Sequence, residues 1–255
     1  MRGILAVTLQ SMQNDMKRVD VVGANLANAT TSGYKREMVI ERPFVELMMQ
    51  TASTAQNAST DESHPLMAQV MTDTRAGMLK ATGQKLDLAL GGNGYFEIQT
   101  NDGIAYTRQG NLQLDARGRL VTAQGYPVLG KAGEIFLKTS NPIIDENGNI
   151  RDGSLDHQGT ATTDKVLAQI KVMTMKDSRA LRKIGDGLIV ANEQAEWTEA
   201  SSPMIKQGHL ENSNVSSMEE MVQLMQAMRH FESMQKVTQG YDEMLGTAIR
   251  KLGDI

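Results

Sequence analysis

Hydrophobic residues near the N-terminus recur in alternating steps of four and three. The positions are Leu5, Leu9, Met12, Met16, Val19, Gly23 and Leu26. This period of 3.5 residues predicts a helix with one apolar seam. We expect Asn25 and Asn28 to end the helix, because asparagine tolerates the left-handed conformation of a C-cap. Gly33 then supplies a second positive φ, Tyr34 is a predicted anchor, and residues 1–48 form a predicted N-terminal helix and assembly joint.

The next segment, residues 49–74, is rich in Ser, Thr, Ala, Gln and Asn. Such a composition buries little apolar surface, and burial is what offsets the entropy lost on folding. The pattern therefore predicts a flexible or extended linker that only a neighbouring element would order.

Short apolar runs separated by turn residues fill residues 75–200. Runs at 95–99 and 104–108 flank an Asp-Gly pair, which is a strong hairpin signal, and an Asn-Gly pair at 147–148 repeats it. The apolar runs at 165–175 and 187–197 predict two longer strands. Turns about every 8–12 residues are typical of a β-sandwich or barrel. A parallel α/β sheet would need intervening helices, and none is indicated.

The helical period returns in the last segment, residues 201–255. A predicted capping box, in which Ser216 and Glu219 bond each other's backbone amides, opens the helix. The apolar positions are Met218, Val222, Met225, Met228, Phe231, Met234, Val237, Tyr241, Met244, Ala248 and Leu252. The predicted fold class is therefore α+β, with an all-β central domain between two amphipathic helices. Each helix must pack on the other, on the β domain or on another copy of the chain.

Composition excludes most chemistry. The chain has no cysteine, so thiolate catalysis, disulfides and cysteine-ligated metals are excluded. The four histidines, His64, His157, His209 and His230, lie far apart without metal-ligand spacing. A net charge of −4 without a cationic cluster argues against nucleic-acid binding. We expect no enzyme activity, no cofactor, no metal, no membrane span and no cleaved signal peptide.

The methionine-rich C-terminal helix admits two interpretations. Its sustained period is that of a helix–helix seam in an assembly. Alternatively, the two helices pair within a monomer, and a methionine-lined groove binds peptides, since methionine suits adaptable surfaces. The two hypotheses differ in the monomer, because assembly predicts weak helicity before association and a binding module predicts a helical monomer.

Three separated motifs resemble those of the flagellar rod and hook family of bacterial axial proteins. "ANLANATTSGYKR" is similar to that family's N-terminal hallmark and lacks one asparagine where Ala24-Asn25 stands. "TGQKLDLALGGNGYFEIQ" and "YTRQGNLQLDARGRLVTAQGYPVLG" resemble its β-domain motifs, and "GHLENSNVSSMEEMVQLMQAMRHFE" resembles its C-terminal motif. A single β region is similar to a rod protein, since the hook protein is longer. The ending resembles the proximal rod member more than the distal one, which remains the alternative.

The resemblance implies a structural subunit whose terminal helices form the inner layer of a helical tube. It implies the flagellar export apparatus, further copies and other rod proteins as partners, and a periplasmic position from which the rod transmits torque. In this interpretation Gly33 lies in a joint outside the β domain. The predicted assembly interface comprises Leu5, Leu9, Met12, Met16, Val19, Asn25, Leu26, Asn28, Gly33, Tyr34, Val215, Met218, Val222, Met225, Met228, Phe231, Met234, Tyr241 and Leu245.

Overall fold

The chain divides into two compact units in the structure, which is a computed structural model. It describes residues 2–40, 69–139, 141–153, 166–175, 181–185, 187–191 and 196–253. The helical unit contains Met1–Ala27, Glu37–Met71 and Ser216–Ile255, and the β unit contains Asn28–Arg36 and Thr72–Val215. The predicted α+β class, with a mostly β central region and a helix at each end, is confirmed.

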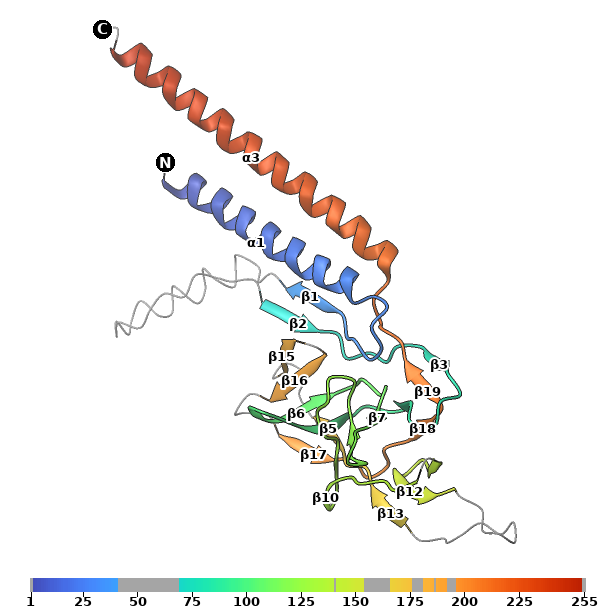
Figure 1. Cartoon of the computed structure of the whole chain (residues 1–255). Coiled ribbons are helices and arrows are strands. Elements are labelled where there is room, and N and C mark those ends of the chain that lie inside the picture. The colour runs from blue at the N-terminus through green and yellow to red at the C-terminus, as the bar shows by residue number, and fades with distance from the viewer. Residues whose placement is uncertain are drawn as a thin grey trace, which may run out of the picture. The chain divides into compact units, whose positions relative to one another are not determined.

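The helical unit is built on two long helices that lie side by side (Figure 1). They are α1 (Arg2–Ala27) and α3 (Ser217–Gly253), of 26 and 37 residues. The short strands β1 (Glu37–Ile40) and β2 (Gln69–Thr72) pair in a two-stranded sheet, and β1 contacts α1. Residues 69–72 of the predicted linker thus form a strand, and residues 49–68 lie outside the described residues.

The helix ends differ in detail from the expectation. Asn25 is not a C-cap, because α1 continues to Ala27 and the Asn25 side chain is buried. At the start of α3 the amide of Glu220 donates to the carbonyl oxygen of Ser216 at 3.0 Å. The buried acid in this first turn is Glu220, whereas Glu219 of the predicted capping box is exposed.

The β unit consists of short strands. In chain order they are β3 (Leu79–Ala81), β4 (Leu88–Leu90), β5 (Tyr95–Thr100), β6 (Gly103–Thr107), β7 (Gln113–Leu114), β8 (Leu120–Val121), β9 (Leu129–Gly130), β10 (Gly133–Glu134), β11 (Pro142–Ile144), β12 (Asn149–Asp152), β13 (Val166–Gln169), β14 (Val172–Met175), β15 (Leu181–Gly185), β16 (Leu188–Ala191), β17 (Trp197–Glu199), β18 (Ile205–Gln207) and β19 (His209–Glu211). The largest sheet has the order β15-β16-β6-β5-β14-β17, and a second has the order β11-β12-β13. Two-stranded pairs complete the unit, among them β18 with β4 and β19 with β3.

One apolar core joins these small sheets. Phe96 and Ile98 of β5 pack with Leu88 of β4, Ile150 of β12 and Ile205 of β18, all almost completely buried. The hairpins that close this core follow the predicted turns. β5 pairs with β6 across Asn101-Asp102, and β11 pairs with β12 next to a glycine in the left-handed region.

Two predicted long strands are each divided. The run at 165–175 forms β13 and β14, which belong to different sheets, and the chain passes between them at Ile170 and Lys171. The run at 187–197 contributes β16 and then the first residue of β17, which are not neighbours in the sheet. A continuous run of apolar residues indicates that a segment is buried. It does not indicate where the chain passes from one sheet to another. Strands also continue beyond residue 200, because β18 and β19 belong to the β unit.

Candidate assembly surface and its buried joints

The C-terminal end of α1 is joined to α3 by a buried asparagine. Asn25 Nδ2 donates to Glu220 Oε2 at 3.0 Å and to the carbonyl oxygen of Glu37 at 2.8 Å. Asn25 Oδ1 accepts from the Glu37 amide at 2.9 Å. One side chain therefore connects α1, α3 and β1. Such a polar contact in an apolar seam favours one register, because any shift leaves buried polar groups unpaired.

A second polar contact lies further along the same helices. Asp15 is buried, and its Oδ2 lies 2.6 Å from Nδ1 of His230, a residue exposed to solvent on one side. The ten residues from Asn25 back to Asp15 correspond to the ten residues from Glu220 to His230. The two helices therefore run antiparallel, and their register does not change between the two contacts.

The face of α3 that packs on α1 repeats in steps of three and four. Glu220 and Ala227 are its buried members. The half-buried apolar side chains that continue the same spacing are Leu224, Phe231, Met234, Tyr241 and Leu245. This stripe is the seam within one chain, and it uses only part of the apolar surface of α3.

A second stripe of apolar side chains remains exposed. On α1 it includes Leu9, which is 58% exposed, and Met16. On α3 the exposed members are Met218, Met221, Val222, Met225, Met228, Val237, Met244 and Ile249. Met218 and Met225, like Met221 and Met228, are seven residues apart, which is the repeat of a second helix-packing seam. Each helix thus has one face for its partner in the chain and another that nothing in the described residues covers.

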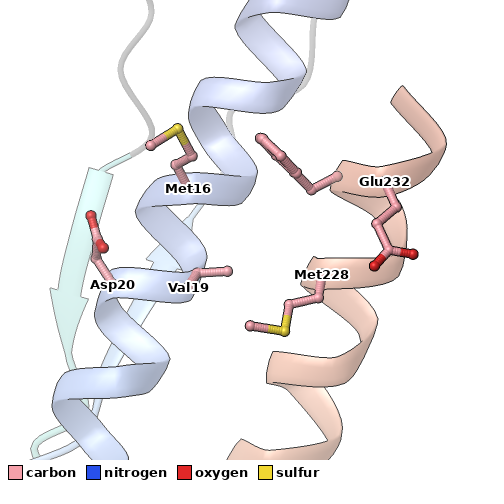
Figure 2. A pocket seen from close by; sticks show the side chains of 6 residues that line it. Met16, Val19, Asp20, Met228 and Glu232 are labelled. Carbon is pink, nitrogen blue, oxygen red and sulfur yellow. The ribbon is translucent and has the colours of Figure 1, made fainter. Parts of the chain in front are cut away.

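Between the two helices this exposed surface is hollowed into a groove of about 390 Å³. Its lining residues are Met16, Val19, Asp20, Met228, Phe231 and Glu232. Val19 and Met228 point toward one another across it, whereas the carboxylate of Asp20 points away (Figure 2). The groove therefore has apolar walls and carboxylates on both helices at its edge, and it can receive an apolar side chain of another helix.

The structure separates the predicted interface residues into four groups. Exposed are Leu9, Met16, Met218, Val222, Met225 and Met228. Half-buried in the helical unit are Met12, Val19, Leu26, Phe231, Met234, Tyr241 and Leu245. Asn25 is buried in the helical unit, and Asn28, Gly33, Tyr34 and Val215 belong to the β unit. The side chain of Leu5 lies outside the described residues.

The β unit contains a buried ion cluster centred on Glu211. Glu211 Oε1 lies 2.6 Å from Nζ of Lys35, and it also accepts from the Gly77 amide at 2.8 Å. Glu211 Oε2 lies 2.8 Å from Nε of Arg108, close enough for an ion pair but poorly aligned for a hydrogen bond. All three side chains are almost fully buried. Burial lowers the pKa of Lys35 below its usual value, and the nearby charge of Arg108 adds to this shift, whereas the hydrogen bond and charge contact with Glu211 oppose it.

The backbone around this cluster is packed closely. The Gly33 amide donates to the carbonyl oxygen of Glu211 at 2.7 Å. Gly33 has a φ of +69°, and a Cβ there would lie 2.5 Å from the carbonyl carbon of Arg108. Only glycine fits both the conformation and the space. Gly33 is thus part of the β unit, and the expectation that it lies in a joint outside this region is wrong.

Two further side chains hold the same segment. Tyr34 is buried, and Nζ of Lys183 lies 4.2 Å from its ring centroid, which is a cation–π contact. Asn214 Oδ1 accepts from the Arg36 amide at 2.7 Å, and its Nδ2 donates to the carbonyl oxygens of Asp73 and Arg75. Tyr34 therefore does anchor the chain, and it does so within the β unit.

Sequence reasoning missed the side chains that join these segments. Lys35, Arg108 and Glu211 lie in three separate motifs, and each motif contains other charged residues, so no local signal singled these three out. Asp15, Glu220 and Ala227 were missed because the interface residues were chosen by the helical spacing of the apolar side chains alone. In the described part of the chain no helix is long and apolar enough to cross a membrane, and no group of side chains there could hold a metal ion.

Comparison with known proteins gives consistent matches along the chain. Residues 8–35 match the family "Flagella basal body rod protein", residues 89–163 match "Flagellar hook protein FlgE/F/G D1 domain", and residues 206–251 match "Flagellar basal body rod FlgEFG protein C-terminal". Each matched segment contributes one member of the ion cluster, namely Lys35, Arg108 and Glu211.

Whole-length relatives carry two different names. The flagellar basal-body rod protein FlgG of Bacillus subtilis is 32% identical over 254 residues, covering 93% of this chain and 94% of the relative. The flagellar basal-body rod protein FlgF of Escherichia coli is 31% identical over 237 residues, covering 89% of each chain. FlgF of Caulobacter vibrioides is 28% identical over the full length of both chains. The sequence identities therefore do not decide whether this chain is of the FlgG or the FlgF type.

Replacing Gly33 by alanine should destabilise the β unit through a steric clash. Gly83 is a matched control, since its φ is +71° and a Cβ there would have no atom within 4 Å. Gly83→Ala therefore incurs only the left-handed strain, about 1–2 kcal/mol. Gly33→Ala should cost about 1–3 kcal/mol more, because Arg108 must move. Urea unfolding followed by the fluorescence of Trp197, the single tryptophan, measures both. Equal losses for the two variants would contradict the packing argument.

Replacing Glu211 by glutamine should leave two buried cations without a carboxylate. Breaking a buried ion pair in this way costs about 3–5 kcal/mol. Glu199→Gln is the control, because Glu199 pairs with Lys131 at 2.7 Å where both side chains are about half exposed. Such a surface pair contributes about 0–1 kcal/mol. The same fluorescence-detected unfolding compares the two, and a loss at Glu211 no larger than at Glu199 would show that the cluster is not a stabilising joint.

Proposed function

We propose that this chain, which belongs to the flagellar basal-body rod protein family, builds the rod through the apolar faces that its two helices leave exposed. The chain is a structural subunit of the bacterial flagellar rod. The observation that supports the proposed interface is the second apolar stripe, whose members Leu9 and Met225 are 58% and 53% exposed. An exposed stripe of this length on an antiparallel helix pair is costly in water and is covered when helices of other copies pack on it.

The structure differs from the assembly hypothesis, which expected weakly helical ends in the single chain. They already pair within one chain, by Asn25 with Glu220 and Asp15 with His230. Pairing within the chain was the expectation of the peptide-binding alternative, and the methionine-lined groove is also present. Membership of a rod family favours another helix of the rod as the occupant of that surface. Contacts between unlike surfaces that do not close produce a filament.

The proposed mechanism is mechanical and needs no catalytic group. Subunits leave the cytoplasm through the flagellar export apparatus and polymerise in the periplasm with other rod proteins. Many interlocked helix contacts then transmit torque from the motor to the hook. The motifs that support this proposal run from the N-terminal "NLANATTSGYKR" to the C-terminal "LENSNV".

A single charge in the exposed stripe should prevent rod assembly. Leu9→Asp and Met225→Asp each place a carboxylate that is wet in the free subunit and buried without a partner in the polymer, at a cost of several kcal/mol per copy. We expect export and an unchanged Trp197-detected unfolding curve, but no rod in electron micrographs and no motility. Gln226→Asp is the control, because this residue is polar, exposed and adjacent to Met225. A working flagellum built from either variant would show that its helix does not line an assembly interface.

We propose the proximal rod position, which rests on the likeness of the ending "RHFESMQKVTQGYDEMLGTAIRKLG" to the proximal member. The distal position is the alternative, since relatives with both names match at similar identity. Gold-labelled antibody against the β unit, applied to isolated basal bodies, should mark the rod near the motor. Labelling next to the hook would instead assign the chain to the distal rod.

A further inference from the structure

The C-terminal part of α3 continues past α1 (Figure 1). Tyr241 and Leu245 continue the seam that packs on α1, and both are half-buried. Ile249 follows Leu245 by four residues and therefore lies on the same face of the helix. Ile249 is nevertheless 69% exposed. The seam thus extends beyond its partner helix, and in the described residues no element covers its last turns.

The end of α3 combines apolar and cationic character. Met244, Ile249 and Arg250 are all exposed. The sequence from 244 to 253 contains no acidic residue. A surface that offers apolar contact to Ile249 and a negative charge to Arg250 would complement this segment.

The groove between α1 and α3 offers both features. Val19, Met228 and Phe231 form its apolar walls, and the exposed carboxylates of Asp20 and Glu232 belong to its lining (Figure 2). Arg229 and Lys236 flank Glu232 along α3 but do not line the groove. Its own charges are therefore negative, and they complement a cation on the helix that enters it.

We propose that in the assembled rod the end of α3, residues 244–250, lies in the α1–α3 groove of a second copy of this chain. Ile249 then covers the apolar walls, and Arg250 faces Glu232 at the edge of the groove. This inference rests on the proposed polymerisation through the helices and names the surfaces that meet.

The contact must form between copies. Met228 and Ile249 are 21 positions apart on one helix, which separates them by about 31 Å at 1.5 Å per residue. The end of α3 therefore cannot reach the groove of its own chain. Groove and helix end are different surfaces, so each contact leaves one of each unused. Such a heterologous contact propagates as a filament.

The absence of cysteine makes a direct test possible. The double variant Met228→Cys with Ile249→Cys, treated with a short bismaleimide in isolated basal bodies, should give a ladder of dimers, trimers and longer species on denaturing gels. The single variants Met228→Cys and Ile249→Cys should remain monomeric on the same gels. A dimer from either single variant would indicate like-with-like contacts and overturn the inference. Absence of a ladder from rods that contain the double variant would also overturn it.

A charge exchange tests the same contact without cysteines and decides the matter if the double cysteine variant builds no rod. Glu232→Arg and Arg250→Glu should each reduce motility, and the chain with both substitutions should recover it, because the opposite charges again face each other between copies. Gln226→Arg is the control. It adds a cation to an exposed position two residues from Met228, and hence on the opposite side of α3, and should leave motility unchanged. A double variant no better than the single ones would contradict the proposed pairing.

The two proposals fail in different ways. If Leu9→Asp and Met225→Asp subunits still form rods, the helices do not line any assembly interface. If those variants fail while the cysteine ladder and the charge recovery are absent, the helices assemble through another part of the exposed stripe.

Discussion

Burial of the Glu211 carboxylate constrains the whole β unit. A carboxylate can be enclosed only where its charge is compensated, and here Lys35 and Arg108 each approach one of its oxygens. These two cations come from distant parts of the unit's sequence, so the ion cluster forms only when the segment after α1, the end of the β5–β6 hairpin and strand β19 are together. The close contact between the backbones of Gly33 and Arg108 forms when the same segments come together. The charge of Glu211 is therefore compensated only in the conformation that brings these three segments together.

The helical unit holds two long helices in register while both keep exposed apolar surface. Two methionine-rich helix faces can pack in several registers, because flexible thioether side chains fit many arrangements. Asn25 with Glu220 and Asp15 with His230 remove that freedom within the chain. Directional polar contacts are thus used inside the subunit, and adaptable apolar contacts remain for its outer surface.

The sequence predicted the order of elements, the fold class and the apolar stripes, since period and turn chemistry are local properties. It also predicted Gly33 at positive φ and Tyr34 as an anchor. It could not assign the stripes to partners, because one period on α3 serves both the seam with α1 and the exposed face. Nor could it predict that Lys35, Arg108 and Glu211 meet, since no local pattern carries the contact between residues more than 70 positions apart. The division of the run at 165–175 between two sheets was missed for the same reason.

The exposed methionines have a chemical consequence. Met218, Met225 and Met228 are open to solvent in the single subunit, and methionine is oxidised to a polar sulfoxide. An oxidised stripe would present polar groups where the proposed interface is apolar, although neither the ion cluster nor the β-unit core would change. If the proposed interface covers these sulfur atoms in the rod, oxidants should damage free subunits more than finished rods. The surface proposed for assembly is therefore also a surface that oxidation would alter.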